Sequence, residues 1–171
     1  EATSPKTLAA WDSLGHLTLV AALEKVFALS FTMEETLAME DARGAQWTKL
    51  IFNAATNPIG ALTGLPHGVA CDQPRLRELI SQLVAEGVAV AGALGITLDS
   101  DPDALVDHAQ KVAYLHKASM LQDILGRRRT EVAALNGGIV EFGRQTGVPT
   151  PLNKAIWALI DGLEHSWTQA K

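Results

Sequence analysis

The chain has 171 residues, of which 47% are hydrophobic and 5% aromatic, and it carries a formal net charge of −5. This length is sufficient for one domain with a buried core. An acidic chain is not expected to bind nucleic acid, because phosphate-binding surfaces need an excess of Lys and Arg. The single cysteine, Cys71, excludes an intramolecular disulfide and predicts a reducing, cytoplasmic setting. The longest apolar run, residues 88–96, is too short to span a bilayer, and we expect neither a membrane segment nor a secretory signal.

The first part of the chain carries an Asp12-Ser13-Leu14 motif, preceded by Trp11 and followed by a helical apolar pattern. It resembles the middle of an acyl carrier protein, in which phosphopantetheine is attached to the serine of such a motif. The resemblance implies phosphopantetheine on Ser13, at a helix N-terminus whose unpaired N–H groups suit a phosphodiester. The alternative is that Asp12 or Ser13 only caps an amphipathic helix.

We expect a boundary near residue 41, where the carrier-like pattern stops. Residues 1–41 would then form a carrier-like helical fragment, and residues 42–171 a separate helical domain. Apolar residues recur at three- and four-residue spacing throughout the second part, and no alternating run has the length of a strand. The sequence therefore predicts an all-α fold.

Local signals predict where the helices begin and end. Because a residue before proline is pushed out of the helical conformation, Asn57-Pro58 is expected to end a helix. Asp101-Pro102 has the character of a helix start, and Gly95 that of a C-terminal cap. The expected helices follow Thr32, run from Ala45 to Asn57, cover residues 76–94, open at Asp101-Pro102, run from Thr130 to Gly147, and start at Thr150-Pro151.

The common catalytic signatures are absent from the sequence. No G-x-G-x-x-G follows a strand, and the P-loop, H-E-x-x-H and G-x-S-x-G motifs do not occur. The five histidines show no helical pairing that would place two metal ligands on one face, so we expect no metal site.

Two polar groups of residues remain as candidates for chemistry. Lys49 and Asn53 are four residues apart and share a helix face, and Asn57 follows at the same spacing. Ser119 and Glu131 lie in a second polar stretch. A lysine ammonium can donate a proton to a nascent alkoxide and stabilise its charge, while a carboxylate can orient the ammonium. The alternative is a solvated edge of a surface helix.

These motifs resemble the C-terminal helical domain of ketopantoate reductases, which is similar to that of 6-phosphogluconate dehydrogenase. The resemblance covers about residues 43–167. It implies that Lys49 is the general acid and that Glu131 assists it. It also implies that Asn53, Asn57 and Ser119 bind the substrate. His116 departs from an Asn expected in some members. The residues that match are Lys49, Asn53, Asn57-Pro58, Ser119-Met120-Leu121-Gln122-Asp123, Thr130-Glu131 and Leu135-Asn136-Gly137.

The resemblance also implies a cofactor and partners. NADPH would be bound mainly by a nucleotide-binding domain that residues 42–171 do not contain, and the substrate would be a small 2-keto acid such as ketopantoate. A nucleotide-binding domain or a second copy could pack on the helical surfaces, and we expect no turnover from this chain alone. Two other functions stay open: a carrier module that acts through Ser13, and a non-catalytic helical interaction domain.

Overall fold

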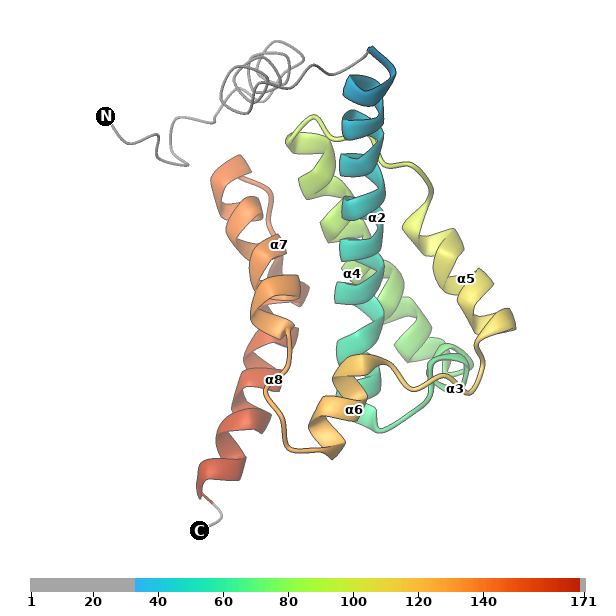
Figure 1. Cartoon of the computed structure of the whole chain (residues 1–171). Helices are drawn as coiled ribbons and strands as arrows, with labels where there is room; N and C mark the ends of the chain where they lie inside the picture. The colour runs from blue at the N-terminus through green and yellow to red at the C-terminus, as the bar shows by residue number, and fades with distance from the viewer. Residues whose placement is uncertain (1–32, 170–171) are drawn as a thin grey trace. The chain divides into compact units, whose positions relative to one another are not determined.

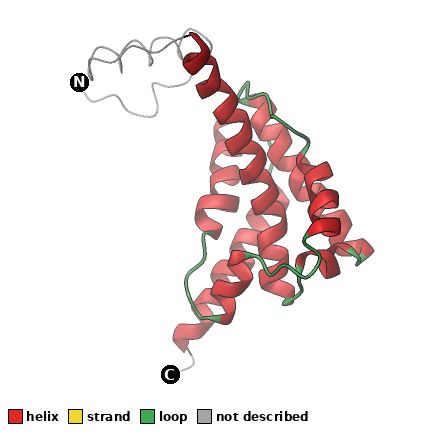
Figure 2. Cartoon of the chain, turned by 45° about the vertical axis from the view of Figure 1, so that its right-hand side comes forward, coloured by secondary structure: helices red, strands yellow, loops and turns green. Residues whose placement is uncertain are grey.

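The computed structural model describes the backbone of residues 33–169 and the side chains of residues 43–167. The helix expected from Asp12 and the candidate phosphopantetheine site at Ser13 lie outside the described residues. Within them every regular element is an α-helix, which confirms the predicted all-α fold (Figure 2). The helices are α2 (Met33–Thr63), α3 (His67–Cys71), α4 (Pro74–Ala93), α5 (Pro102–Val112), α6 (Ser119–Leu125), α7 (Val132–Thr146) and α8 (Pro151–Gln169).

The chain divides into two units, residues 1–43 and 44–171. The description that follows concerns the second unit. The assignment of residues 1–41 to a carrier-like domain stays a prediction.

Helix α2 corrects two of the sequence-based expectations. The helices expected after Thr32 and from Ala45 are one continuous helix, and it passes through Pro58 to end at Thr63. Pro58 has no N–H, so the Ala54 carbonyl loses its partner in the helix. The side chain of Asn136 supplies the missing donor, with its Nδ2 2.9 Å from the Ala54 oxygen. A contact from a distant helix therefore offsets the local effect of proline.

A buried polar network extends from this contact. Asn136 Nδ2 also donates to Asn153 Oδ1 at 2.9 Å, and Asn153 Nδ2 donates to Glu86 Oε2 at 2.7 Å. Both asparagines are 0% exposed. The Glu86 carboxylate accepts two further bonds, from the backbone N–H groups of Leu152 and Asn153 at 2.8 and 2.9 Å. It thus satisfies unpaired donors in the first turn of α8, where an anion is also favoured by the helix dipole.

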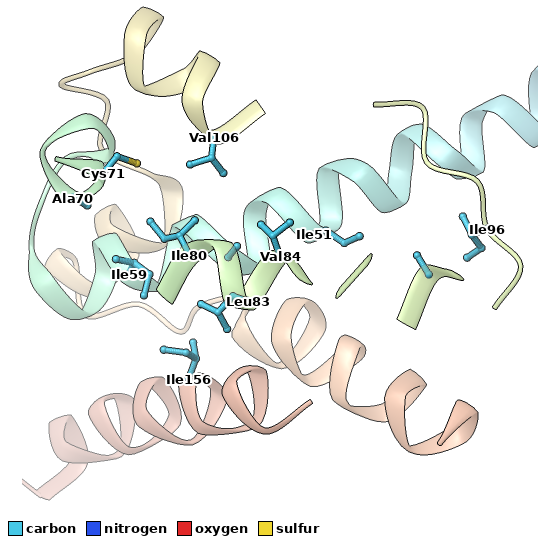
Figure 3. Close-up of a cluster of buried hydrophobic side chains, with 12 residues drawn as sticks. Ile51, Ile59, Ala70, Cys71, Ile80, Leu83, Val84, Ile96, Val106 and Ile156 are labelled. Carbon is cyan, nitrogen blue, oxygen red and sulfur yellow. The ribbon is translucent and has the colours of Figure 1, made fainter. Parts of the chain in front are cut away.

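The helices pack around α2 and α4. Figure 1 shows α7 and α8 on one side of this pair and α3 with α5 on the other. The largest apolar cluster lies among these helices. Figure 3 shows side chains from α2, α4 and α8 converging in it. Its least exposed members include Ile51, Ile80, Leu83 and Val106. The network of Asn136, by contrast, joins α2, α4, α7 and α8.

Several predicted helix ends are confirmed. Asp101 precedes α5 and accepts a hydrogen bond from the Asp103 N–H at 2.9 Å, and α8 begins at Pro151. Gly95 and Gly147 follow α4 and α7 with φ of 69° and 75°, the left-handed conformation that glycine adopts without strain. The short helix α3 was not expected, because its surroundings contain turn residues on both sides.

Replacing Asn136 by Ala is expected to lower the free energy of unfolding by about 2–4 kcal/mol, since it leaves the Ala54 carbonyl and the Asn153 amide oxygen without a donor in the core. Urea unfolding followed by circular dichroism measures the change. Gln145→Ala is the matched control, because the Gln145 amide donates to Glu141 at the exposed surface. Equal, small effects of the two substitutions would contradict the role assigned to Asn136.

Candidate functional site

Three polar side chains follow one another along α2 at four-residue spacing: Lys49, Asn53 and Asn57. We call this set the α2 polar stripe. Lys49 is exposed, Asn53 is partly buried, and Asn57 is only 8% exposed. The spacing of four residues turns the stripe gradually around the helix. The stripe therefore runs from solvent towards the interior as α2 approaches its C-terminal end.

Asn57 is the one member of the stripe whose side chain has a hydrogen-bond contact within the described residues, and that contact is long. Its Oδ1 is 3.5 Å from Thr56 Oγ1, while that hydroxyl makes a shorter bond of 2.8 Å to the Phe52 carbonyl. A single hydroxyl proton cannot serve both oxygens well. Asn57 Oδ1 has only this long contact within the described residues, and it can accept a hydrogen bond from a polar group of a ligand.

Helix α6 places Ser119 near the Asn57 end of the stripe. Ser119 is the first residue of α6 and is exposed, whereas Met120 and Leu121 are each 2% exposed. A Cβ built on Gly60 would lie 3.9 Å from Leu121 Cβ, so α6 packs on α2 about one turn beyond Asn57. Ser119 thus starts a helix that is anchored beside the stripe.

Helix α3 holds the segment that leads into α6. The backbone N–H groups of His67 and Gly68 donate to the carbonyls of His116 and Tyr114, each at 2.9 Å. Two backbone hydrogen bonds from the start of α3 therefore hold the chain segment that immediately precedes Ser119.

Glu131 lies at the start of α7 and is exposed. The next residue, Val132, is 3% exposed and belongs to an apolar cluster with Ala61, Met120 and Ile160. Glu131 was expected in the first turn of a helix, and it is the residue immediately before that helix. The start of α7 therefore packs against the C-terminal part of α2 and the start of α6.

Lys49 lies towards the other end of the stripe. Helix α7 runs antiparallel to α2, because Asn136 contacts Ala54 while the Trp47 and Phe142 rings are 5.4 Å apart. The axial distance from Lys49 to Ala61 is about 18 Å, at about 1.5 Å per residue. Within the described residues neither Lys49 nor Glu131 has a side-chain hydrogen-bond partner. Met120 and Val132, which follow Ser119 and Glu131, pack with Ala61 beyond the Asn57 end of the stripe. The contact of Glu131 with Lys49 stays a prediction.

Three consecutive arginines, residues 127–129, precede Thr130 and Glu131 and have different surroundings. Arg128 pairs with Asp123 at 2.9 Å and closes the end of α6. Arg127 has φ of 50°, in the left-handed region, and Arg129 is exposed.

Two other reactive side chains, His67 and Cys71, are partly buried and buried, respectively. Burial lowers the pKa of His67 and raises the pKa of the Cys71 thiol, whose sulfur is 3.7 Å from His67 Nε2. Both are therefore uncharged near pH 7, and Cys71 is not an activated nucleophile. Over residues 43–167, no group of three His, Cys, Asp or Glu side chains could hold a metal ion. Among the helices that the structure describes, none combines the length and apolarity needed to cross a membrane.

Two residues that sequence reasoning assigned no role proved important. Asn136 was noted only as part of a motif, although Pro58 inside a helical pattern signals that the Ala54 carbonyl needs an outside donor. Glu164 accepts hydrogen bonds from both the N–H and the hydroxyl of Thr130, at 2.8 and 2.7 Å. No local signal could have found it, because the two residues are far apart in sequence.

Comparison with known proteins shows the family of the chain. The family model described as "Ketopantoate reductase PanE/ApbA C terminal" matches residues 41–164. The chain is 35% identical over 130 residues to 2-dehydropantoate 2-reductase of Pyrococcus horikoshii, covering 76% of this chain and 43% of that protein. The crystal structure of a PanE/ApbA family ketopantoate reductase from Ralstonia eutropha has a TM-score of 0.71 at 32% identity, over 74% of this chain and 42% of that one. A D-mandelate dehydrogenase structure with NADH and anilino(oxo)acetate has a TM-score of 0.64 at 25% identity, over 70% of this chain and 40% of that one.

These matches place the fold among the helical domains of oxidoreductases. The chain belongs to the family of ketopantoate reductase C-terminal domains. It spans less than half the length of the Pyrococcus horikoshii relative. The family match begins at residue 41 and does not include Ser13, so the comparisons give the carrier resemblance no support.

Replacing Gly60 by Leu is expected to lower the free energy of unfolding by about 1–3 kcal/mol, because the larger side chain must displace Leu121 and with it the start of α6. The Cβ alone would be 3.3 Å from the Leu65 carbonyl oxygen. Gly162→Leu on α8 is the control, since a Cβ there meets nothing within 4 Å. Urea unfolding of both variants tests the packing of α6 on α2, and equal stability of the two would contradict it.

Proposed function

We propose that the chain contains the substrate-binding and catalytic helical domain of an NADPH-dependent 2-keto acid reductase that converts ketopantoate to pantoate. The observation that supports this proposal is the packing of the starts of α6 and α7 against α2 just beyond Asn57, on the helix that also carries Lys49. Ser119 and Glu131 adjoin the buried residues that make this contact. The residues that the family resemblance implies as site residues thus lie on one side of α2 and on the two helix starts packed against it. Membership of the family supports the same reading.

Lys49 acts as the general acid. Reduction of a ketone leaves a developing negative charge on its oxygen, and a lysine ammonium can both stabilise that charge and donate the proton that completes the alcohol. Lys49 is exposed in this unit, and a small substrate could reach it from solvent. Asn53, Asn57 and Ser119 supply amide and hydroxyl donors for the carboxylate and hydroxyl groups of the substrate.

Glu131 assists the lysine through its negative charge. Lys49 and the Ala61 level of α2, where Val132 packs, lie on one helix about 18 Å apart at about 1.5 Å per residue, so this role requires the long side chains of Lys49 and Glu131 to extend towards each other along α2. Both side chains are exposed and without hydrogen-bond partners in the described residues, which leaves them able to move. The exposed Glu131 carboxylate can also accept a hydrogen bond from a hydroxyl group at the far end of a polar substrate.

NADPH supplies the hydride when it is bound. The residues that the structure describes contain only helices and none of the strand and glycine-rich loop that cradle a dinucleotide phosphate. The nucleotide is therefore assigned mainly to a separate domain, and this chain contributes the groups that bind and protonate the keto acid. Packing of such a domain, or of a second copy of the chain, against the exposed side of the stripe would exclude water from the site.

Replacing Lys49 by Ala is expected to lower kcat for ketopantoate reduction by about 10²- to 10⁴-fold in the complete polypeptide, because the positioned acid is lost. Oxidation of NADPH followed by absorbance measures the rate. Lys154→Ala, which removes an exposed lysine from α8, is the matched control and should leave kcat unchanged. Calorimetry on the chain itself adds a second reading: ketopantoate should bind to the wild type and more weakly to the variant. Absence of both binding and turnover would favour a non-catalytic interaction domain.

We retain a second candidate for residues 1–41 on the strength of the Asp12-Ser13-Leu14 motif alone. A carrier segment would accept phosphopantetheine on Ser13 from a phosphopantetheinyl transferase and coenzyme A. Mass spectrometry of the incubated chain would then show one added phosphopantetheine on the peptide that contains Ser13. Ser13→Ala is the control, and an unchanged wild-type mass would eliminate this candidate.

A further inference from the structure

Glu164, on α8, holds the residue that precedes Glu131. Its Oε1 accepts a hydrogen bond from the Thr130 N–H at 2.8 Å and another from the Thr130 hydroxyl at 2.7 Å. Glu164 is partly buried, and bonds to an ionised acceptor are stronger than bonds between neutral groups. Two short bonds to one oxygen fix both the backbone and the side chain of Thr130.

The residue after Glu131 is held as well. Thr130 Oγ1 accepts from the Val132 N–H at 3.3 Å, and the Val132 side chain is 3% exposed in the cluster with Ala61 and Met120. The hydroxyl of Thr130 thus donates to Glu164 and accepts from the first turn of α7. Glu131 lies between two anchored residues, so its backbone is constrained while its carboxylate remains exposed.

We propose that Glu164 is a positioning residue, which directs the Glu131 carboxylate towards the Asn57 end of the α2 polar stripe. This inference rests on the proposed function, because it assigns Glu164 a role through Glu131. The two hydrogen bonds that hold Thr130 come from Glu164 on α8. The other groups of the proposed site come from α2, α6 and the start of α7. Helix α8 is therefore the element that sets the direction of one carboxylate in the site.

The test uses the complete polypeptide that contains this domain, assayed for ketopantoate-dependent NADPH oxidation. Glu164→Ala removes the acceptor, and kcat is expected to fall about 10- to 100-fold, the size of effect that a misplaced catalytic group produces. KM should change much less, because Ser119 and the α2 stripe are untouched. Glu164→Gln keeps an acceptor oxygen and should recover most of the loss.

A second pair of variants separates positioning from a general loss of stability. If Glu164 acts through Glu131, then Glu164→Ala should lower kcat no further once Glu131 has been replaced by Gln. Hydrogen exchange of residues 127–134 should become faster in Glu164→Ala at unchanged exchange in α4. A merely structural role would lower kcat by the same factor in both backgrounds, and that result would overturn the proposal.

Glu141→Ala is the matched control, because Glu141 is an exposed glutamate on α7 whose carboxylate pairs with Arg144. It should alter neither kcat nor exchange at residues 127–134. Normal kcat in Glu164→Ala of an active enzyme would overturn the positioning role while leaving the proposed function intact. A wild-type polypeptide that reduces no 2-keto acid would instead overturn both, since Glu131 would then have no reaction to assist.

Discussion

The hydrogen bond from Asn136 to the Ala54 carbonyl is the constraint on which the site depends. Proline in a helix removes one donor, and without a substitute the buried carbonyl would be unpaired. Asn136 supplies that substitute from α7 and passes the network on through Asn153 to Glu86 on α4. Because α2 continues beyond Pro58, it can carry Asn57 into the interior and still present Gly60 to α6.

The residues of the proposed site come from helix starts as much as from a helix face. Ser119 opens α6 and Glu131 precedes α7, and each is followed by a buried apolar residue that anchors the helix in the core. Because Met120 and Val132 are fixed in the core, they restrict where the adjacent exposed residues, Ser119 and Glu131, can lie. Lys49 is different, because it projects from the middle of a long helix and remains at the solvent-exposed end of the stripe.

Capping residues and glycines predicted the helix ends correctly where no tertiary contact opposed their local preference. Asp101 caps α5 through the Asp103 N–H, and Gly95 and Gly147 adopt the left-handed conformation after α4 and α7. The prediction failed at Asn57-Pro58, where the local preference of a residue before proline was opposed by a buried partner. Each hydrogen bond left unmade in a core costs about 1–3 kcal/mol, which is comparable to the local penalty of proline. Tertiary contact therefore decided the length of α2.

The sequence by itself determined the all-helical class, the family and the candidate polar residues. It could do so because hydrophobic periodicity and motif spacing depend only on residues close together in the chain. It also placed Lys49, Asn53 and Asn57 on one face, since a four-residue spacing fixes that arrangement in any helix. Only the tertiary structure decided which part of α2 the start of α7 packs against, and that Glu164 binds Thr130. Those features depend on antiparallel packing and on hydrogen bonds between residues far apart in the chain, which leave no local pattern.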